Sequence, residues 1–209
     1  MARGNGMNQL HEVLSRIAIE IDRQGVPWAL IGGLAVSVYV EPRFTRDIDL
    51  AIAVPNDIEA ERLLHRLQFV GYGVQMVLEQ TAVDRLATVR VLPPGESSEG
   101  VVVDCMFASS GIEPEICRDA ERFEVIEGLE VPVSRPGHLL ALKVLARDDV
   151  RRPQDLVDIR SLLAHIGSDE RDRARHALEL ITQRGFHRGR DLITMLEVLL
   201  GEQNVPADD

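Results

Sequence analysis

The sequence has few cysteines and no long apolar run. Its two cysteines, Cys105 and Cys117, form no CxxC pattern, which argues against a disulfide framework and against a zinc finger. The N-terminal residues lack the apolar stretch of a signal peptide, and no apolar run reaches the length of a membrane span. These absences lead us to expect a cytoplasmic protein without a membrane partner.

Motifs of several common enzyme classes are also missing. Ser109 and Ser110 stand outside any Gly-x-Ser-x-Gly context, which argues against a serine hydrolase. The pair Gly32-Gly33 is not followed by the Gly-Lys-Ser/Thr of a Walker A loop. With a net charge of −11 and a pI of about 5.0, the chain lacks the generally basic surface that binds duplex nucleic acid, although a local basic cleft is compatible with this charge.

The composition and the hydrophobic pattern predict a globular α+β protein. At 209 residues and 45% hydrophobic content, the chain has the size of one domain, or one domain with a small appendage. The periodicity predicts helices at 8–24, 34–40 and 56–68, strands at 28–31, 47–54, 74–79, 86–92 and 101–107, and a hairpin at 123–133. From Pro136 the pattern is helical, over 136–147, 153–166, 168–183 and 189–200.

We therefore expect a mixed β-sheet flanked by helices and followed by a C-terminal helical bundle. The division falls near residue 135, so the predicted domains are 1–135 and 136–203. Residues 204–209 are polar and are expected to form a disordered tail.

Three aspartates carry the first chemical signal. In Asp47-Ile48-Asp49 the two carboxylates are two positions apart on a predicted strand, so they point to one face. Two adjacent carboxylates repel each other unless a cation lies between them, and hard oxygen ligands suit Mg²⁺ or Mn²⁺. Asp104 is a lone charge in an apolar strand and is the candidate for a third ligand.

The glycine pair adds a possible phosphate site. A Gly-Gly step between a strand and a helix exposes backbone N–H groups to an anion, as Gly32 and Gly33 do in the predicted arrangement. Taken singly, these motifs have ordinary explanations: Gly-Gly is usually a turn, Asp-x-Asp a solvated strand end, and a lone Asp in a strand a salt-bridge member. Their order along the chain, strand–turn–helix–strand–strand, is much harder to reach by chance.

These residues resemble the nucleotidyltransferase fold of the DNA polymerase β superfamily. The pattern reads Ile31-Gly32-Gly33, thirteen residues, Asp47-Ile48-Asp49-Leu50 and later Val103-Asp104-Cys105. The longer string from Arg43 to Leu50 resembles the AbiEii-type toxins and related bacterial nucleotidyltransferase-like proteins. The resemblance spans about residues 28–165 and is more specific for the superfamily than for the subfamily.

The resemblance implies an enzyme that uses a nucleoside triphosphate and two metal ions, with pyrophosphate as the leaving group. By this resemblance Asp47 and Asp49 bind both metals, Asp104 binds the catalytic metal and helps to deprotonate the acceptor, and Gly32 and Gly33 hold the β- and γ-phosphates. The acceptor hydroxyl belongs to an RNA such as tRNA, to a protein or to a small molecule. A toxin role with an antitoxin partner is implied by the subfamily.

Four further residues are candidates for nucleotide binding. Lys143 is the only charge in Leu139–Ala146; it is either a snorkelling lysine at the rim of the core or a triphosphate-binding lysine, which the toxin family carries on its first C-terminal helix. Asp155 either favours the dipole of its helix or lies near the active site, and we prefer it to Asp158. Arg43 and Arg46 flank the carboxylates and either contact phosphate or neutralise the cluster.

Two interpretations stay open. The first is an active, metal-dependent nucleotidyltransferase. The second is a non-catalytic module that keeps the fold and binds a nucleotide or a protein. The retention of all three carboxylates argues against the second. A segment from Arg171 to Arg190 holds six arginines; without interleaved aromatic residues we interpret it as a solvated helical face rather than an RNA contact.

Overall fold

The computed structural model describes residues 2–41, 45, 47–81, 83–97 and 99–203. Within these residues a seven-stranded sheet has the order β3-β4-β5-β2-β1-β7-β6. The strands are β1 (Trp28–Ile31), β2 (Asp47–Ile52), β3 (Gly73–Gln80), β4 (Arg85–Leu92), β5 (Val102–Met106), β6 (Glu121–Ile126) and β7 (Leu129–Val133). The helices are α1 (Ala2–Arg23), α2 (Gly32–Tyr39), α3 (Asp57–Phe69), α4 (Glu113–Asp119), α5 (Pro136–Ala146), α6 (Pro153–His165), α7 (Ser168–Gln183) and α8 (Leu192–Gln203).

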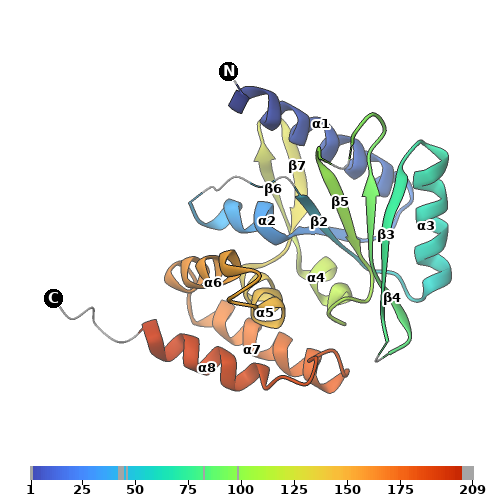
Figure 1. Ribbon diagram of the computed structural model, residues 1–209. Helices are drawn as coiled ribbons and strands as arrows, with labels where there is room; N and C mark the ends of the chain where they lie inside the picture. Colours follow the sequence, from blue (N-terminus) through green and yellow to red (C-terminus); the bar gives the residue numbers. More distant parts are fainter. Residues whose placement is uncertain (1, 42–44, 46, 82, 98, 204–209) are drawn as a thin grey trace.

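The sheet is mixed, with the parallel pairs near its centre. β2 runs parallel to β5 and antiparallel to β1, and β1 runs parallel to β7. β4 is antiparallel to both β5 and β3, and β6 is antiparallel to β7. Figure 1 shows α1 along the upper side of the sheet and the helices α5–α8, drawn in orange to red, below it. This arrangement confirms the predicted α+β class.

The alternation in β2 explains how a charged strand lies inside the fold. Ile48 and Leu50 are fully buried and belong to the same apolar core as Leu14 and Ile17 of α1. Because successive side chains of a strand point to opposite faces, Asp47 and Asp49, which alternate with these residues, point away from that core. The burial of the apolar face therefore fixes the face on which the carboxylates stand.

Most predicted elements are confirmed, with differences at their ends. The backbone N–H of Glu59 donates to Oδ1 of Asn56 at 3.1 Å, which caps the N-terminus of α3, the helix predicted at 56–68. α2 begins at Gly32 rather than at residue 34, because the two glycines form its first turn. α4 was not predicted; it has seven residues and a proline in its first turn, too short for a helical period to be recognised.

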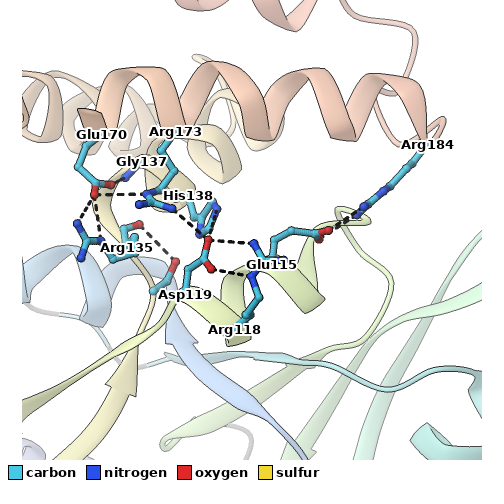
Figure 2. A network of polar contacts seen from close by, with 10 residues as sticks. Glu115, Arg118, Asp119, Arg135, Gly137, His138, Glu170, Arg173 and Arg184 are labelled. Atoms are coloured by element: carbon cyan, nitrogen blue, oxygen red, sulfur yellow. Dashed lines mark hydrogen bonds and ion pairs between the residues drawn. The ribbon is translucent and has the colours of Figure 1, made fainter. Parts of the chain in front are cut away.

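Polar contacts tie the C-terminal helices to the rest of the chain (Figure 2). Arg173 of α7 donates to Asp119 at the end of α4 at 3.0 Å. Glu170 accepts the backbone N–H of Gly137 at 2.8 Å and the Nε of Arg135 at 3.0 Å, so it caps the first turn of α5. A Cβ on Gly137 would lie 2.4 Å from the carbonyl oxygen of Glu170. A glycine is therefore needed where α5 crosses α7.

The arginines of segment 171–190 make intramolecular contacts at the protein surface. Arg184 pairs with Glu115 of α4 at 2.7 Å, and Arg175 pairs with Glu197 of α8 at 2.7 Å. Arg190 donates to the carbonyl oxygens of Leu145 and Arg147 at 3.0 and 2.9 Å. The side chains of Arg175 and Arg184 are 36% and 38% exposed, so these ion pairs lie at the protein surface.

His138 in the first turn of α5 gives the fold a dependence on pH. Burial lowers the pKa of His138 to about 4, against an opposing influence from Asp119 and a further lowering by Arg173. Because the folded protein disfavours the charged form of His138, protonation favours unfolding. The protein therefore keeps the contribution of the neutral histidine above the unfolded pKa near 6.5 and loses it as the pH falls toward 4. The loss amounts to at most about 3 kcal/mol.

We expect His138→Gln to flatten the pH dependence of unfolding by urea between pH 7.5 and 4.5. His165→Gln, at an exposed helix end, is the matched control and should leave the wild-type slope unchanged. An equally steep slope in His138→Gln and wild type would show that other groups carry the dependence. The side chain of His138 is 5% exposed, so glutamine must also be checked for folding by circular dichroism.

Candidate active site

The strand register places Asp49 and Asp104 side by side. In the parallel pair β2–β5, Asp49 stands opposite Asp104 and Asp47 stands opposite Val102. Partners in adjacent strands share a face, so both carboxylates project from the same side of the sheet. Asp104 is 7% exposed, Asp49 is half-buried, and Asp47 at the start of β2 is exposed. The sequence-predicted carboxylates are thus neighbours in space.

Gly32 lies directly against Asp49. Gly32 has a φ of +68°, and a Cβ at this position would lie 1.9 Å from Oδ2 of Asp49. Both facts call for glycine, because an L side chain is strained at this φ and has no room here. The first turn of α2 has no side-chain cap hydrogen bond, so its backbone N–H groups, which include those of Gly32 and buried Gly33, suit an anion.

We expect Gly32→Ala to displace the Asp49 carboxylate and to destabilise the protein by more than Gly25→Ala. Gly25 is the matched control because it has nearly the same φ, +66°, but no atom lies within 4 Å of the place a Cβ would take there. Strain at positive φ costs both variants roughly 1–2 kcal/mol, and only Gly32→Ala adds the clash. Urea unfolding of the two variants measures the difference; equal losses would contradict the close approach at Gly32.

The environment of Asp49 disfavours its charge. Burial, together with repulsion from Asp104 and Asp47, raises the pKa of Asp49 to about 6 against the attraction of Lys143 and Arg152. Within the described residues, no hydrogen bond or ion pair to the Asp49 carboxylate is found. A crowded carboxylate with this environment favours a bound cation.

Lys143 is buried on α5 and pairs with two carboxylates of α6. Its Nζ lies 2.7 Å from Oδ1 of Asp155 and 2.8 Å from Oδ2 of Asp158. Arg152 adds its Nε at 3.0 Å from the second oxygen of Asp155, an ion pair without a well-aligned hydrogen bond. The contact is not that of a snorkelling lysine, because Lys143 is 8% exposed. Its charge reaches the carboxylates of the sheet, since it lowers the pKa of Asp49.

Arg90 of β4 is a site residue that the sequence prediction missed. Its Nε donates to Oδ1 of Asp104 at 2.8 Å and its Nη2 to Oδ2 at 2.7 Å. The hydrogen bonds that Arg90 donates to Asp104 raise the pKa of Arg90, and the charges of Asp104, Asp47 and Asp49 act in the same direction. The argument that singled out Asp104, a lone charge in an apolar strand, also applies to Arg90 between Val89 and Val91 and would have found it.

The donor set suits a divalent cation in part. Mg²⁺ is typically held by one or two carboxylates together with substrate phosphates, and Asp47 and Asp49 beside the first turn of α2 offer that combination. In the part of the chain that the structure describes, no three His, Cys, Asp or Glu side chains gather closely enough to hold a metal ion by themselves. Arg43 and Arg46, predicted to contact nucleotide, lie outside the described residues, as does the predicted tail 204–209.

The sequence was compared with models of protein families. Residues 12–208 match the model described as the nucleotidyl transferase AbiEii toxin of type IV toxin–antitoxin systems. The chain belongs to the AbiEii family. It is therefore a nucleotidyltransferase by family, which confirms the enzyme class inferred from the carboxylate and glycine motifs. A comparison with curated protein sequences gave no significant match.

Solved structures support the fold of this AbiEii family member. An antigenic nucleotidyltransferase-like protein from Paracoccidioides brasiliensis is 22% identical, with a TM-score of 0.51 over 91% of this chain and 93% of that protein. ANT(2″)-Ia, solved in complex with adenylyl-2″-tobramycin, is 17% identical, with a TM-score of 0.52 over 83% of this chain and 97% of that protein. At these identities the likeness shows the nucleotidyltransferase-like fold and nothing finer. Within the described residues, no helix is both long and apolar enough to cross a membrane.

Proposed function

We propose that the chain transfers a nucleoside monophosphate from a nucleoside triphosphate to an acceptor hydroxyl and requires Mg²⁺ or Mn²⁺ to do so. The observation that carries the proposal is the placement of Asp49 beside Asp104 on adjacent strands, against the uncapped first turn of α2. Carboxylates and free backbone N–H groups at one place are what a metal-bound triphosphate needs. Membership of the AbiEii family supports the reaction class.

Each predicted residue has a role in this proposal. Asp47 and Asp49 hold the cation, and the backbone N–H groups of Gly32 and Gly33 bind the β- and γ-phosphates. Asp104 is the ligand that joins for the catalytic step and assists the removal of the acceptor proton. Lys143, held in place by Asp155, contributes positive charge to the triphosphate, and Arg43 and Arg46 contact phosphate or neutralise the carboxylates.

The chemistry is an in-line displacement at the α-phosphorus. The acceptor oxygen forms a bond to this phosphorus, the bond to the oxygen that bridges to the β-phosphate breaks, and pyrophosphate leaves with the electron pair. The bound cation supplies positive charge that offsets the negative charge developing on the phosphates. In this scheme residues 1–135 form the catalytic domain, and residues 136–203 form the helical domain that supplies Lys143 and Asp155.

We further propose that the enzyme acts as the toxin of a toxin–antitoxin pair, which the description of the family as toxins of type IV systems supports. The acceptor is an RNA such as tRNA, a protein or a small molecule. The adenylylated antibiotic in the ANT(2″)-Ia complex makes an aminoglycoside the small molecule to test. Induced expression in a bacterial host should arrest growth, and the arrest should depend on Asp49.

The decisive experiment is incubation with each of the four α-labelled ribonucleoside triphosphates, in separate reactions with total RNA, a protein extract and an aminoglycoside. Label is expected in one of the three acceptors, which identifies the acceptor class, and addition of excess EDTA should reduce the transfer to background. No transfer with any triphosphate, acceptor or divalent cation would overturn the proposed function.

A further inference from the structure

Arg90 engages both oxygens of the third carboxylate. The fork of Nε and Nη2 on Oδ1 and Oδ2 of Asp104, at 2.8 and 2.7 Å, is the two-point geometry in which guanidinium binds carboxylate most strongly. The side chains of Arg90 and Asp104 are 31% and 10% exposed. The pair is thus partly shielded from water and is stronger than a typical surface ion pair.

Arg90, Asp104 and Asp49 form a row across three adjacent strands. Arg90 is the register partner of Asp104 in the β4–β5 pair, and Asp104 is the register partner of Asp49 in the β5–β2 pair. Asp104 therefore lies between the guanidinium of Arg90 and the carboxylate of Asp49, and all three are on one face of the sheet. The carboxylate of Asp104 is directed toward Arg90, which accounts for the absence of a three-carboxylate metal cluster within the described residues.

We propose that Arg90 is a positioning residue that keeps Asp104 away from the cation site until the nucleotide arrives. This inference rests on the proposed function. In the nucleotide-free protein a divalent cation meets only Asp47 and Asp49, and the guanidinium of Arg90 opposes a second positive charge beside Asp104. The triphosphate brings negative charge that offsets this repulsion, so Asp104 leaves Arg90 and completes the site only when substrate is bound.

The consequence is an ordered assembly of the site. A site with three free carboxylates binds divalent cations without nucleotide, and it holds them in a form that has no substrate to act on. A site in which one carboxylate is held by an arginine binds the free cation weakly and the cation–triphosphate complex well. The proposal thus assigns Arg90 a part in selecting the complex over the free ion.

The test measures the affinity of nucleotide-free protein for Mn²⁺ by electron paramagnetic resonance of the unbound ion. Arg90→Gln is expected to bind Mn²⁺ roughly tenfold or more tightly than wild type, because one positive charge next to the site is removed and Asp104 is freed. Water-proton relaxation should show fewer water molecules on the bound Mn²⁺, since a carboxylate has replaced one of them. Equal or weaker affinity in Arg90→Gln overturns the inference.

Two controls separate the role of Asp104 from charge alone. Arg85→Gln breaks the other ion pair of β4, between Arg85 and Asp57 at 2.6 Å, and should leave the Mn²⁺ affinity unchanged. The double variant Arg90→Gln/Asp104→Asn should lose both the gain in affinity and the loss of water. If the double variant keeps the gain in affinity, the inference is overturned, because Asp104 is then not the added ligand.

A second variant protects the test against misfolding. Arg90→Lys keeps the charge without the two-point geometry and is expected to bind Mn²⁺ with an affinity between those of wild type and Arg90→Gln. If wild type and all variants fold but none binds Mn²⁺ with or without triphosphate, the proposed function fails. If all bind Mn²⁺ equally, the proposed function stands and only the role of Arg90 is lost.

Discussion

Asp49→Asn is expected to lower nucleotidyl transfer by a factor on the order of 1,000 while making the cation-free protein more stable. The loss of activity follows from the removal of a charge that offsets the cation at the reacting phosphate, since electrostatic stabilisation is usually the largest part of catalysis. Steady-state transfer of label under saturating triphosphate measures this loss. Activity within tenfold of wild type would remove Asp49 from the proposed site.

Asp49→Asn is expected to raise stability although it lowers activity, because the charged form of Asp49 is disfavoured in the folded state. Burial, together with repulsion from Asp104 and Asp47, raises the pKa of Asp49 from 3.8 to about 6. Such a carboxyl group does not destabilise the fold below about pH 4, and the destabilisation grows as the pH rises from about 4 to about 6. At pH 7.5 Asp49→Asn should therefore gain about 2–3 kcal/mol of unfolding free energy in EDTA.

Asp57→Asn is the matched control for this gain. Although burial acts to raise it, hydrogen bonds from Arg85 and from the backbone of Leu86 hold the pKa of Asp57 below its usual value. Its charge therefore stabilises the fold, and Asp57→Asn should be no more stable than wild type at pH 7.5. A similar gain in both variants would mean that the net charge of −11, rather than local crowding, is what Asp49→Asn relieves.

Lys143→Met is expected to destabilise the protein by about 3–5 kcal/mol, since breaking a buried ion pair leaves an uncompensated charge. Here the buried carboxylates of Asp155 and Asp158, whose side chains are 3% and 2% exposed, lose the lysine charge, although Arg152 still lies 3.0 Å from Asp155. Methionine has nearly the shape of the lysine stem, so the loss of packing is small. Urea unfolding at pH 7.5 measures the effect; a loss below about 1 kcal/mol would mean that water reaches the two carboxylates.

The triple variant Lys143→Met/Asp155→Asn/Asp158→Asn separates the structural part of this effect from substrate binding. This variant also removes the carboxylate charges of Asp155 and Asp158 and should recover most of the lost stability. Triphosphate binding, measured by calorimetry with Mg²⁺, should stay weak in the triple variant because the positive charge is still absent. Recovery of both stability and binding would make Lys143 a structural residue only.

Local sequence pattern was sufficient for the parts of the fold that depend on neighbours in the chain. The spacing of Asp47 and Asp49 predicted that both carboxylates of β2 share one face, and the hydrophobic periodicity predicted a helix at 56–68, where α3 lies. The carboxylates and glycines of the proposed site were found because their motif is short and in a fixed order. Their convergence follows from the pairing of β2 with β5.

The missed features depend on contacts between distant segments. Arg90 and Asp104 are fourteen residues apart and meet only because β4 and β5 pair in one particular register. The partners of Lys143 lie on the next helix, and the sequence favoured Asp155 alone, whereas Asp158 lies equally close. The ion-pair partners of the arginines in segment 171–190 were not predicted because they lie far away in the chain, 69 residues for Arg184 and Glu115. A register shift of one residue changes every strand pair, and composition does not fix it.

The order of the elements along the chain determines when the residues of the proposed site emerge during synthesis. β7 is the last strand to emerge, it pairs with the first strand of the chain, and α5 follows it directly. The carboxylates of β2 and β5 are in place before that step, while Lys143 and its partners on α6 are not. A nascent chain that ends before α6 thus carries the proposed cation ligands but lacks Asp155 and Asp158, the carboxylates that pair with Lys143.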